Sequence, residues 1–240
     1  MFTGCRAPVW AKSLDVDGKL VGPFSNTADC PGGFGPFWST PYRQAWAFVV
    51  QQLAAKYDNH PLIQEVAVTS CSTYTAEPFI FPVGSFDDSV KSALRAAGYT
   101  DILHRQCLAQ AVADYAQWQT SRLTFPFSSF RGLTQAADVA FTEQVMRGCR
   151  QAVGRRCVLD NHGLDSNLEA HILPIYALIR KMGPEIAFQT LVEKPHDFEG
   201  TIRKGISLGA GSIELYQQPE GFPAVDSATL KQWAAMFQPQ

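Results

Sequence analysis

Short apolar runs alternate with longer amphipathic stretches along the chain, a pattern typical of strands and helices in turn. The runs predict strands at residues 1–5, 63–70, 122–127, 156–160, 185–191 and 212–216. Helical periodicity follows each run, at residues 41–57, 86–97 and 100–119, 136–153, 167–181, 198–207 and 227–237. Regular alternation of strand and helix predicts a parallel sheet.

Several helix boundaries carry local signals. Thr40 is a candidate N-cap in front of Pro41, and Ser85 is another for the stretch that follows it. Glycines mark helix ends at Gly98, Gly154 and Gly183. The final helix begins at a cap formed by either Asp226 or Ser227.

Glycine-rich turns do not favour a nucleotide-binding sheet. The candidates, at 31–35 and 208–211, lack the GxGxxG spacing between a strand and a helix, and no Walker motif is present. We therefore expect an α/β fold of the TIM (β/α)₈-barrel type, formed as a single domain over residues 1–240 with about six βα units.

Alternation within the predicted strands separates barrel-facing from helix-facing side chains. Ile213 and Leu215 should face the helices, which turns Glu214 into the barrel; likewise Gln189 should point inward between apolar neighbours. Asp160, Asn161 and His162 follow another strand. Polar residues at the carboxyl ends of barrel strands line the active site, so these side chains are expected to share one rim.

At this point the chain resembles bacterial glycoside hydrolases with a (β/α)₈ barrel, of the cellulase and β-galactosidase type. The similarity lies in the segment 53–63, which contains Tyr57-Asp58-Asn59-His60-Pro61, and in the strand that follows it and leads to Glu77-Pro78. A second similarity is the segment 4–10, which ends in Pro8-Val9-Trp10 and is similar to the end of a third barrel strand.

The resemblance implies that the six units are strands three to eight and that the first two units are missing. Such a barrel would leave unpaired parallel edges. Either the chain is a fragment or a mis-started gene product, or a homo-oligomer covers the gap.

The resemblance also implies two catalytic carboxylates. Glu77 matches the acid/base glutamate that follows the fourth strand, although the usual preceding Asn is absent. Where these enzymes carry a nucleophile on strand seven, the chain has Gln189, which cannot take that role. We therefore take Glu214 as the second catalytic carboxylate beside Glu77, with Asp160 as the reserve candidate. A purely structural role, such as a hydrogen bond within the fold, would also account for the presence of each carboxylate.

Aromatic residues suggest where a sugar binds. The long loop at residues 8–40 is rich in Trp and Phe, whose rings stack on the apolar faces of sugars but also serve loop packing. The strongest candidate for stacking on a sugar is Trp10. The complete set of candidate substrate-binding residues is Trp10, Trp38, Tyr74, Asn161, His162, Gln189 and Tyr216.

Composition narrows the choice of partners. The net charge of -2 and the absence of basic clusters give no support for nucleic acid, and no apolar run spans a bilayer. The five histidines form no HxH or HExxH motif, so neither a metal nor another cofactor is expected. The six cysteines are interpreted as buried or free thiols; bridges Cys5–Cys30 or Cys149–Cys157 remain open for an exported protein.

The start of the chain carries no signal peptide, so localisation stays open: outside the cell if a signal has been lost with the N-terminus, cytoplasmic otherwise. The sequence as a whole predicts a glycoside hydrolase acting on an oligo- or polysaccharide. The alternatives are a catalytically inactive carbohydrate-binding barrel and a truncated gene product.

Overall fold

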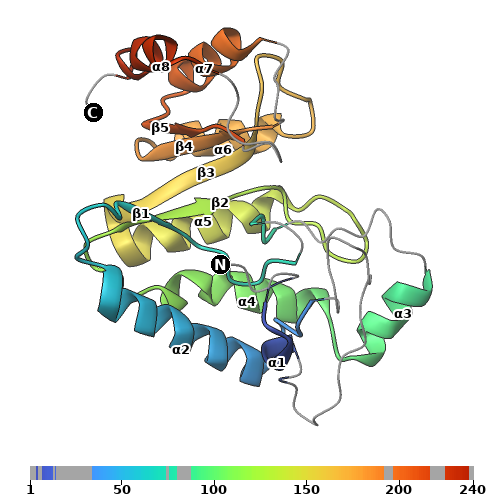
Figure 1. The fold of residues 1–240 in the computed structure, drawn as a ribbon. Coiled ribbons are helices and arrows are strands. Elements are labelled where there is room, and N and C mark those ends of the chain that lie inside the picture. Colours follow the sequence, from blue (N-terminus) through green and yellow to red (C-terminus); the bar gives the residue numbers. More distant parts are fainter. Residues whose placement is uncertain are drawn as a thin grey trace.

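A five-stranded parallel sheet forms the centre of the protein (Figure 1). The computed structural model describes residues 4, 7–12, 14, 34–73, 76–79, 88–191, 197–216 and 225–237. The strands lie side by side in chain order, and every neighbouring pair is parallel. They are β1 (Glu65–Ala67), β2 (Arg122–Pro126), β3 (Cys157–Leu164), β4 (Ile186–Thr190) and β5 (Ser212–Glu214).

Helices connect these strands. Those within the described residues are α1 (Val9–Lys12), α2 (Thr40–Tyr57), α3 (Asp88–Ala96), α4 (Asp101–Asp114), α5 (Val139–Val153), α6 (Leu173–Lys181), α7 (Phe198–Ser207) and α8 (Ser227–Ala234). In Figure 1, α2, α4 and α5 lie beside β1 to β3, whereas α7 and α8 lie at the β5 end of the sheet.

The predicted six-unit TIM barrel is wrong. The sheet is a curled half-barrel of five strands, and β1 and β5 are its edges among the described residues. The predicted strand at 1–5 falls outside those residues except for Gly4, which is not in a strand and whose backbone lies against the Thr73 carbonyl. Alternation within strands predicts which face is buried, but it holds equally for open and closed parallel sheets.

The predicted elements lie close to the observed ones. The helix at 198–207 matches α7. The predicted cap Thr40 is wrong: Thr40 is the first residue of α2, and the cap is Ser39, whose hydroxyl accepts the Tyr42 N–H. The larger differences concern polar segments: β3 extends to Leu164, and α6 begins only at Leu173. The predicted cap Ser85 lies outside the described residues.

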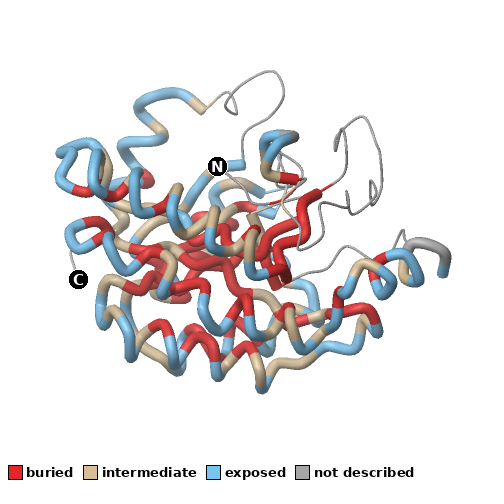
Figure 2. The backbone as a smooth tube through the Cα atoms, turned by 90° about the horizontal axis from the view of Figure 1, so that it is seen from below, coloured by how far each residue is buried: buried red, intermediate tan, exposed pale blue. Residues whose placement is uncertain are grey.

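One face of the sheet packs against the helices. Phe188 stacks on Tyr176 of α6, with 4.8 Å between ring centroids. Ile213 approaches Gly205 of α7 so closely that a Cβ at Gly205 would lie 2.6 Å from its side chain. Figure 2 shows the buried residues concentrated between the strands and these helices. The predicted outward direction of Phe188 and Ile213 is therefore confirmed.

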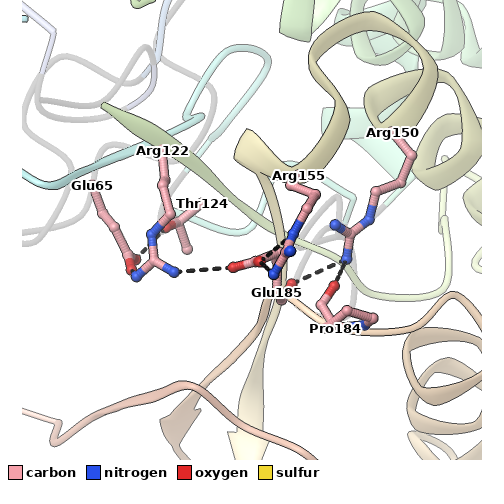
Figure 3. Close-up of polar contacts among 7 residues, drawn as sticks. All are labelled: Glu65, Arg122, Thr124, Arg150, Arg155, Pro184 and Glu185. Atoms are coloured by element: carbon pink, nitrogen blue, oxygen red, sulfur yellow. Dashed lines mark hydrogen bonds and ion pairs between the residues drawn. The ribbon is translucent and has the colours of Figure 1, made fainter. Parts of the chain in front are cut away.

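Charged residues occupy the amino-terminal end of the opposite, concave face (Figure 3). Arg122 forms ion pairs with Glu65 and with Glu185, and Arg155 binds Glu185 at 2.6 Å. Burial acts to raise the pKa of Glu185, but the hydrogen bonds and charges of Arg155 and Arg122 outweigh it and lower the pKa. These pairs link β1, β2 and the start of β4 at the end of the sheet where the strands begin.

Two disulfides link strands and loops to the helix layer. Cys149 of α5 is bonded to Cys157 of β3, and Cys71, after β1, is bonded to Cys107 of α4. The interpretation of these four cysteines as thiols was wrong, and of the two bridges left open the Cys149–Cys157 bond is present. The other, Cys5–Cys30, lies outside the described residues.

Candidate functional site

The ends of β2 and β3 and the segment after β1 meet around a cavity of about 480 Å³. They meet because the carboxyl ends of parallel strands share one edge of the sheet. The residues that line the cavity are Glu77, Ser128, Ser129, Arg131, Gln135, Asn161, His162, Gly163, His171, Ile172, Ile175 and Leu191. It thus contains carboxylate, imidazole, guanidinium and hydroxyl groups beside apolar side chains.

A bulge in β3 shapes this edge. The register with β4 shifts between Asn161 and Leu164. The Asn161 side chain holds the bulge, because its Nδ2 donates to the Phe127 carbonyl at 2.7 Å and its Oδ1 accepts the Gly163 N–H at 2.8 Å. A Cβ at residue 163 would meet Asn161 Oδ1 at 2.9 Å, so a larger residue at this position would displace the Asn161 side chain. Bulges of this kind redirect side chains beside functional sites.

Asp160 and His162 form a nearly buried pair beside the bulge. Their Oδ2 and Nε2 atoms are 3.0 Å apart, and the side chains are 5% and 11% exposed. Within the described part of the chain, Asp160 Oδ1 is buried and has no hydrogen-bond partner. An unpaired buried carboxylate oxygen is costly, so this atom stands ready to accept a hydrogen bond.

Two further carboxylates act on His162. Burial acts to lower its pKa, but the hydrogen bond to Asp160 and the charges of Asp160, Glu77 and Glu214 outweigh burial and raise the pKa. The three carboxylates that the sequence indicated therefore all lie within electrostatic reach of His162. A raised pKa favours the imidazolium, which neutralises part of this negative charge.

Glu77 and the two residues that follow it are held by hydrogen bonds. The Ser128 hydroxyl donates to Glu77 Oε1 at 3.3 Å. His104 Nε2 donates to the Pro78 carbonyl at 2.9 Å, and Arg131 N–H donates to the Phe79 carbonyl at 3.0 Å. Glu77 is thereby fixed relative to β2 and α4, although it follows the end of β1 by ten residues.

Glu214 and Gln189 are neighbours on β5 and β4. Glu214 is exposed because β5 is an edge strand, while Gln189 is half-buried. Tyr216, two residues further on, is 41% exposed, and its N–H donates to Thr190 Oγ1. Glu214, Gln189 and Tyr216 do not line the cavity, but Glu214 lies within electrostatic reach of His162.

The predicted aromatic residues lie elsewhere. Trp10 on α1 is 60% exposed and lines a separate apolar cavity of about 120 Å³ with Tyr42 and Trp46 of α2. Trp38 is buried, packs edge-on against Tyr99 and donates its indole N–H to the Ala97 carbonyl. Tyr74 lies outside the described residues.

Sequence reasoning missed most of the cavity wall, including the polar residues Ser128, Ser129, Arg131 and Gln135. These polar residues follow β2, and the run Ser128-Ser129-Phe130-Arg131 could have been found as a polar segment at a strand end. Gln135 has a left-handed backbone with φ of 59°, which is uncommon outside glycine, and its carbonyl accepts from Arg131 Nη1 at 2.9 Å.

Neither a metal centre nor a membrane span is indicated within the described ranges. No three His, Cys, Asp or Glu side chains there are grouped so that they could hold a metal ion. No helix in the same ranges has the length and apolarity to cross a bilayer. Comparison with protein-family models, with curated proteins and with solved structures finds no match.

Proposed function

We propose that the protein hydrolyses O-glycosidic bonds of an oligosaccharide at the cavity beside Glu77 and His162. One arrangement carries this proposal: Glu77 and His162 line the same cavity at the carboxyl end of the sheet, Asp160 is bonded to His162, and Glu214 lies within electrostatic reach of it. Glycosidic cleavage needs two carboxyl groups beside the bond, one as proton donor and the other as base or nucleophile. The cavity offers hydroxyl, amide and guanidinium groups to sugar hydroxyls.

The surroundings of each carboxylate suggest its role. Glu77 lines the cavity and is the proton donor. Asp160 is bonded to His162 and nearly covered, so it orients the imidazole. Glu214 does not line the cavity, but it is exposed and within electrostatic reach of His162, so it is the second carboxylate for a substrate that extends from the cavity towards β5.

Aryl glycosides with different leaving groups separate these roles. A phenyl glycoside needs a proton donor, whereas a 2,4-dinitrophenyl glycoside leaves without one. We expect Glu77→Gln to lose about 10²- to 10⁴-fold in kcat/KM on the phenyl glycoside and to keep activity on the dinitrophenyl glycoside. Glu214→Gln should lose both activities.

Glu199→Gln is the matched control, because Glu199 is an exposed residue of α7 that pairs with Arg203 outside the cavity. It should hydrolyse both glycosides like the unmodified protein. If Glu77→Gln hydrolyses the phenyl glycoside at the unmodified rate, the assignment of the proton donor is wrong.

A second candidate function is carbohydrate binding without turnover. Gln189 favours it, because an amide lies beside Glu214 at the end of β4, where the resembled enzymes carry a nucleophilic glutamate. Glycan binding measured by calorimetry, with no hydrolysis of any aryl glycoside, would support this function over the first.

A further inference from the structure

Arg131 stands out among the residues of the cavity. Its backbone N–H donates to the Phe79 carbonyl, two residues beyond Glu77, and its Nη1 donates to the Gln135 carbonyl. Both ends of the residue are therefore fixed, and the guanidinium is held in a set position relative to Glu77. A long flexible side chain held in this way has already lost much of its conformational entropy before any ligand binds.

The charge of Arg131 is not neutralised by a carboxylate within the described ranges. Arg105, Arg122, Arg147, Arg155 and Arg203 each form an ion pair with Asp or Glu there, whereas Arg131 forms none, as is also true of Arg43, Arg95, Arg150, Arg156 and Arg180. Among these unpaired arginines, Arg131 is the one that lines the cavity. His171 also lies on the cavity wall. Its Nδ1 is 3.0 Å from Oε2 of Glu169 and so already has a carboxylate partner. Among the residues that the structure describes, one of the five guanidinium donors of Arg131 is used, in the bond to Gln135.

The cavity is consequently divided by charge. Glu77, with Asp160 behind His162, makes one part acidic, and Arg131 makes another part cationic. Ile172, Ile175 and Leu191 add apolar side chains to the wall. A neutral sugar would satisfy the acidic part through its hydroxyls but would leave the guanidinium without a counter-charge.

We infer that the substrate of this site contains an anionic sugar, whose carboxylate or sulfate group is bound by Arg131. A guanidinium matches the two oxygens of such a group with parallel N–H donors, which a lysine cannot do. The inference rests on the proposed glycosidase site, since it assigns the substrate class for the same cavity.

Hydrolysis of matched substrates tests the inference. The 4-nitrophenyl β-D-glucuronide and β-D-glucoside differ only in the carboxylate at C6, and the glucoside 6-sulfate supplies the other anion. We expect kcat/KM to be about 10- to 100-fold higher for the better of the two anionic substrates than for the glucoside. The better one identifies the group as carboxylate or sulfate.

Substitution of Arg131 should remove this preference. Arg131→Gln should lower kcat/KM for the anionic substrate much more than for the glucoside, so that the two substrates become nearly equal; Arg131→Lys should keep part of the preference. Arg180→Gln, at an exposed position of α6 outside the cavity, is the control and should behave like the unmodified protein. The backbone bond from residue 131 to Phe79 persists in both variants, and near-ultraviolet circular dichroism checks their folding.

Binding separates a failure of this inference from a failure of the proposed function. Calorimetry with D-glucuronate, D-glucose 6-sulfate and D-glucose needs no turnover. If no glycoside is hydrolysed but an anionic sugar binds more tightly than glucose, and this difference disappears in Arg131→Gln, the inference holds and the hydrolase proposal fails. The inference would be overturned if anionic and neutral sugars were hydrolysed with equal kcat/KM and bound with equal affinity. It would also be overturned if a preference for the anionic sugar persisted in Arg131→Gln.

Discussion

His104 should make the fold sensitive to acid. Its ring is fully buried against Phe37 and Phe130, with ring centroids 4.8 and 5.1 Å away. Nε2 donates to the Pro78 carbonyl, so Nδ1 carries the lone pair and faces the Tyr99 hydroxyl at 3.0 Å. Burial is the main cause that lowers the His104 pKa from 6.5 to about 4.

The size of the effect follows from linkage. Because the pKa of the folded state lies below that of the unfolded chain, the unfolded chain binds more protons at His104 between pH 4 and 6.5. Neutral His104 therefore stabilises the fold fully above about pH 6.5, and this stability is lost as the pH falls towards 4. A difference of about 2.5 between the two pKa values corresponds to about 3 kcal/mol in total.

Urea unfolding of His104→Gln measures this contribution. An amide does not titrate and retains a donor for the Pro78 carbonyl. Between pH 7 and pH 5, the free energy of unfolding of the unmodified protein should fall by about 2 kcal/mol more than that of the variant. Groups that titrate in both proteins cancel in this comparison, and His60→Gln, at an exposed position, should not change the result.

Equal losses of stability in the two proteins would refute the reasoning. A direct measurement covers the case in which the variant does not fold: the His104 ring signals of the unmodified protein, followed by NMR, should titrate well below pH 6. Normal titration near 6.5 would mean that the ring is solvated and does not hold the Pro78 carbonyl.

Three further outcomes are expected in urea unfolding experiments. Replacing Cys71 and Cys107 by Ser opens a link across 36 residues and should lower stability by about 4 kcal/mol, since loop-closure entropy is returned to the unfolded chain; no loss would mean that the bond does not form. Asp58→Ala should cost about 3 kcal/mol, because backbone N–H groups at 119, 120 and 121 lose their carboxylate acceptor; a cost below 1 kcal/mol would contradict this role. Tyr176→Phe should be neutral or stabilising by about 1 kcal/mol, since its buried hydroxyl has no partner within the described residues; a clear loss of stability would reveal a partner.

The sequence predicted the strands well where apolar residues alternate. The run at 122–127 matches β2, and the directions of Phe188 and Ile213 follow from period-two alternation. The extension of β3 was missed because Asn161-His162-Gly163 reads as a polar loop. Its strand geometry depends on the bond from Asn161 to the Phe127 carbonyl, which joins residues far apart in sequence.

The segment that carried the family resemblance has a structural role here. Asp58 accepts the N–H groups of Gln119, Thr120 and Ser121, which lie directly before β2. Burial acts to raise its pKa, but these hydrogen bonds outweigh it and lower the pKa. A Tyr-Asp pair at the end of a helix can thus be explained by the hydrogen bonds of its Asp to the connection before the next strand.

The pattern of polar and apolar positions predicted the candidate site only where it lies on strands, whereas Glu77, in a loop, was indicated by the family resemblance. Asp160, His162 and Glu214 follow from strand positions, since the carboxyl ends of parallel strands share an edge. Arg131 was not predictable, because it follows the end of β2 by five residues and its position depends on the Phe79 carbonyl. The course of such a loop is determined by tertiary contacts that a local pattern does not contain.

The open sheet changes what each carboxylate can do. In a closed barrel every strand has two neighbours, so inward carboxylates would be covered to a similar degree. Here Asp160 lies on the central strand β3 and is 4% exposed, whereas Glu214 lies on the edge strand β5 and is exposed. Because a covered carboxylate can orient a neighbour and an exposed one can meet a substrate, the half-barrel itself separates the two roles. The assignment of Asp160 to His162 and of Glu214 to the substrate therefore depends on strand position in an open sheet, and it would have no basis in the closed barrel that the sequence suggested.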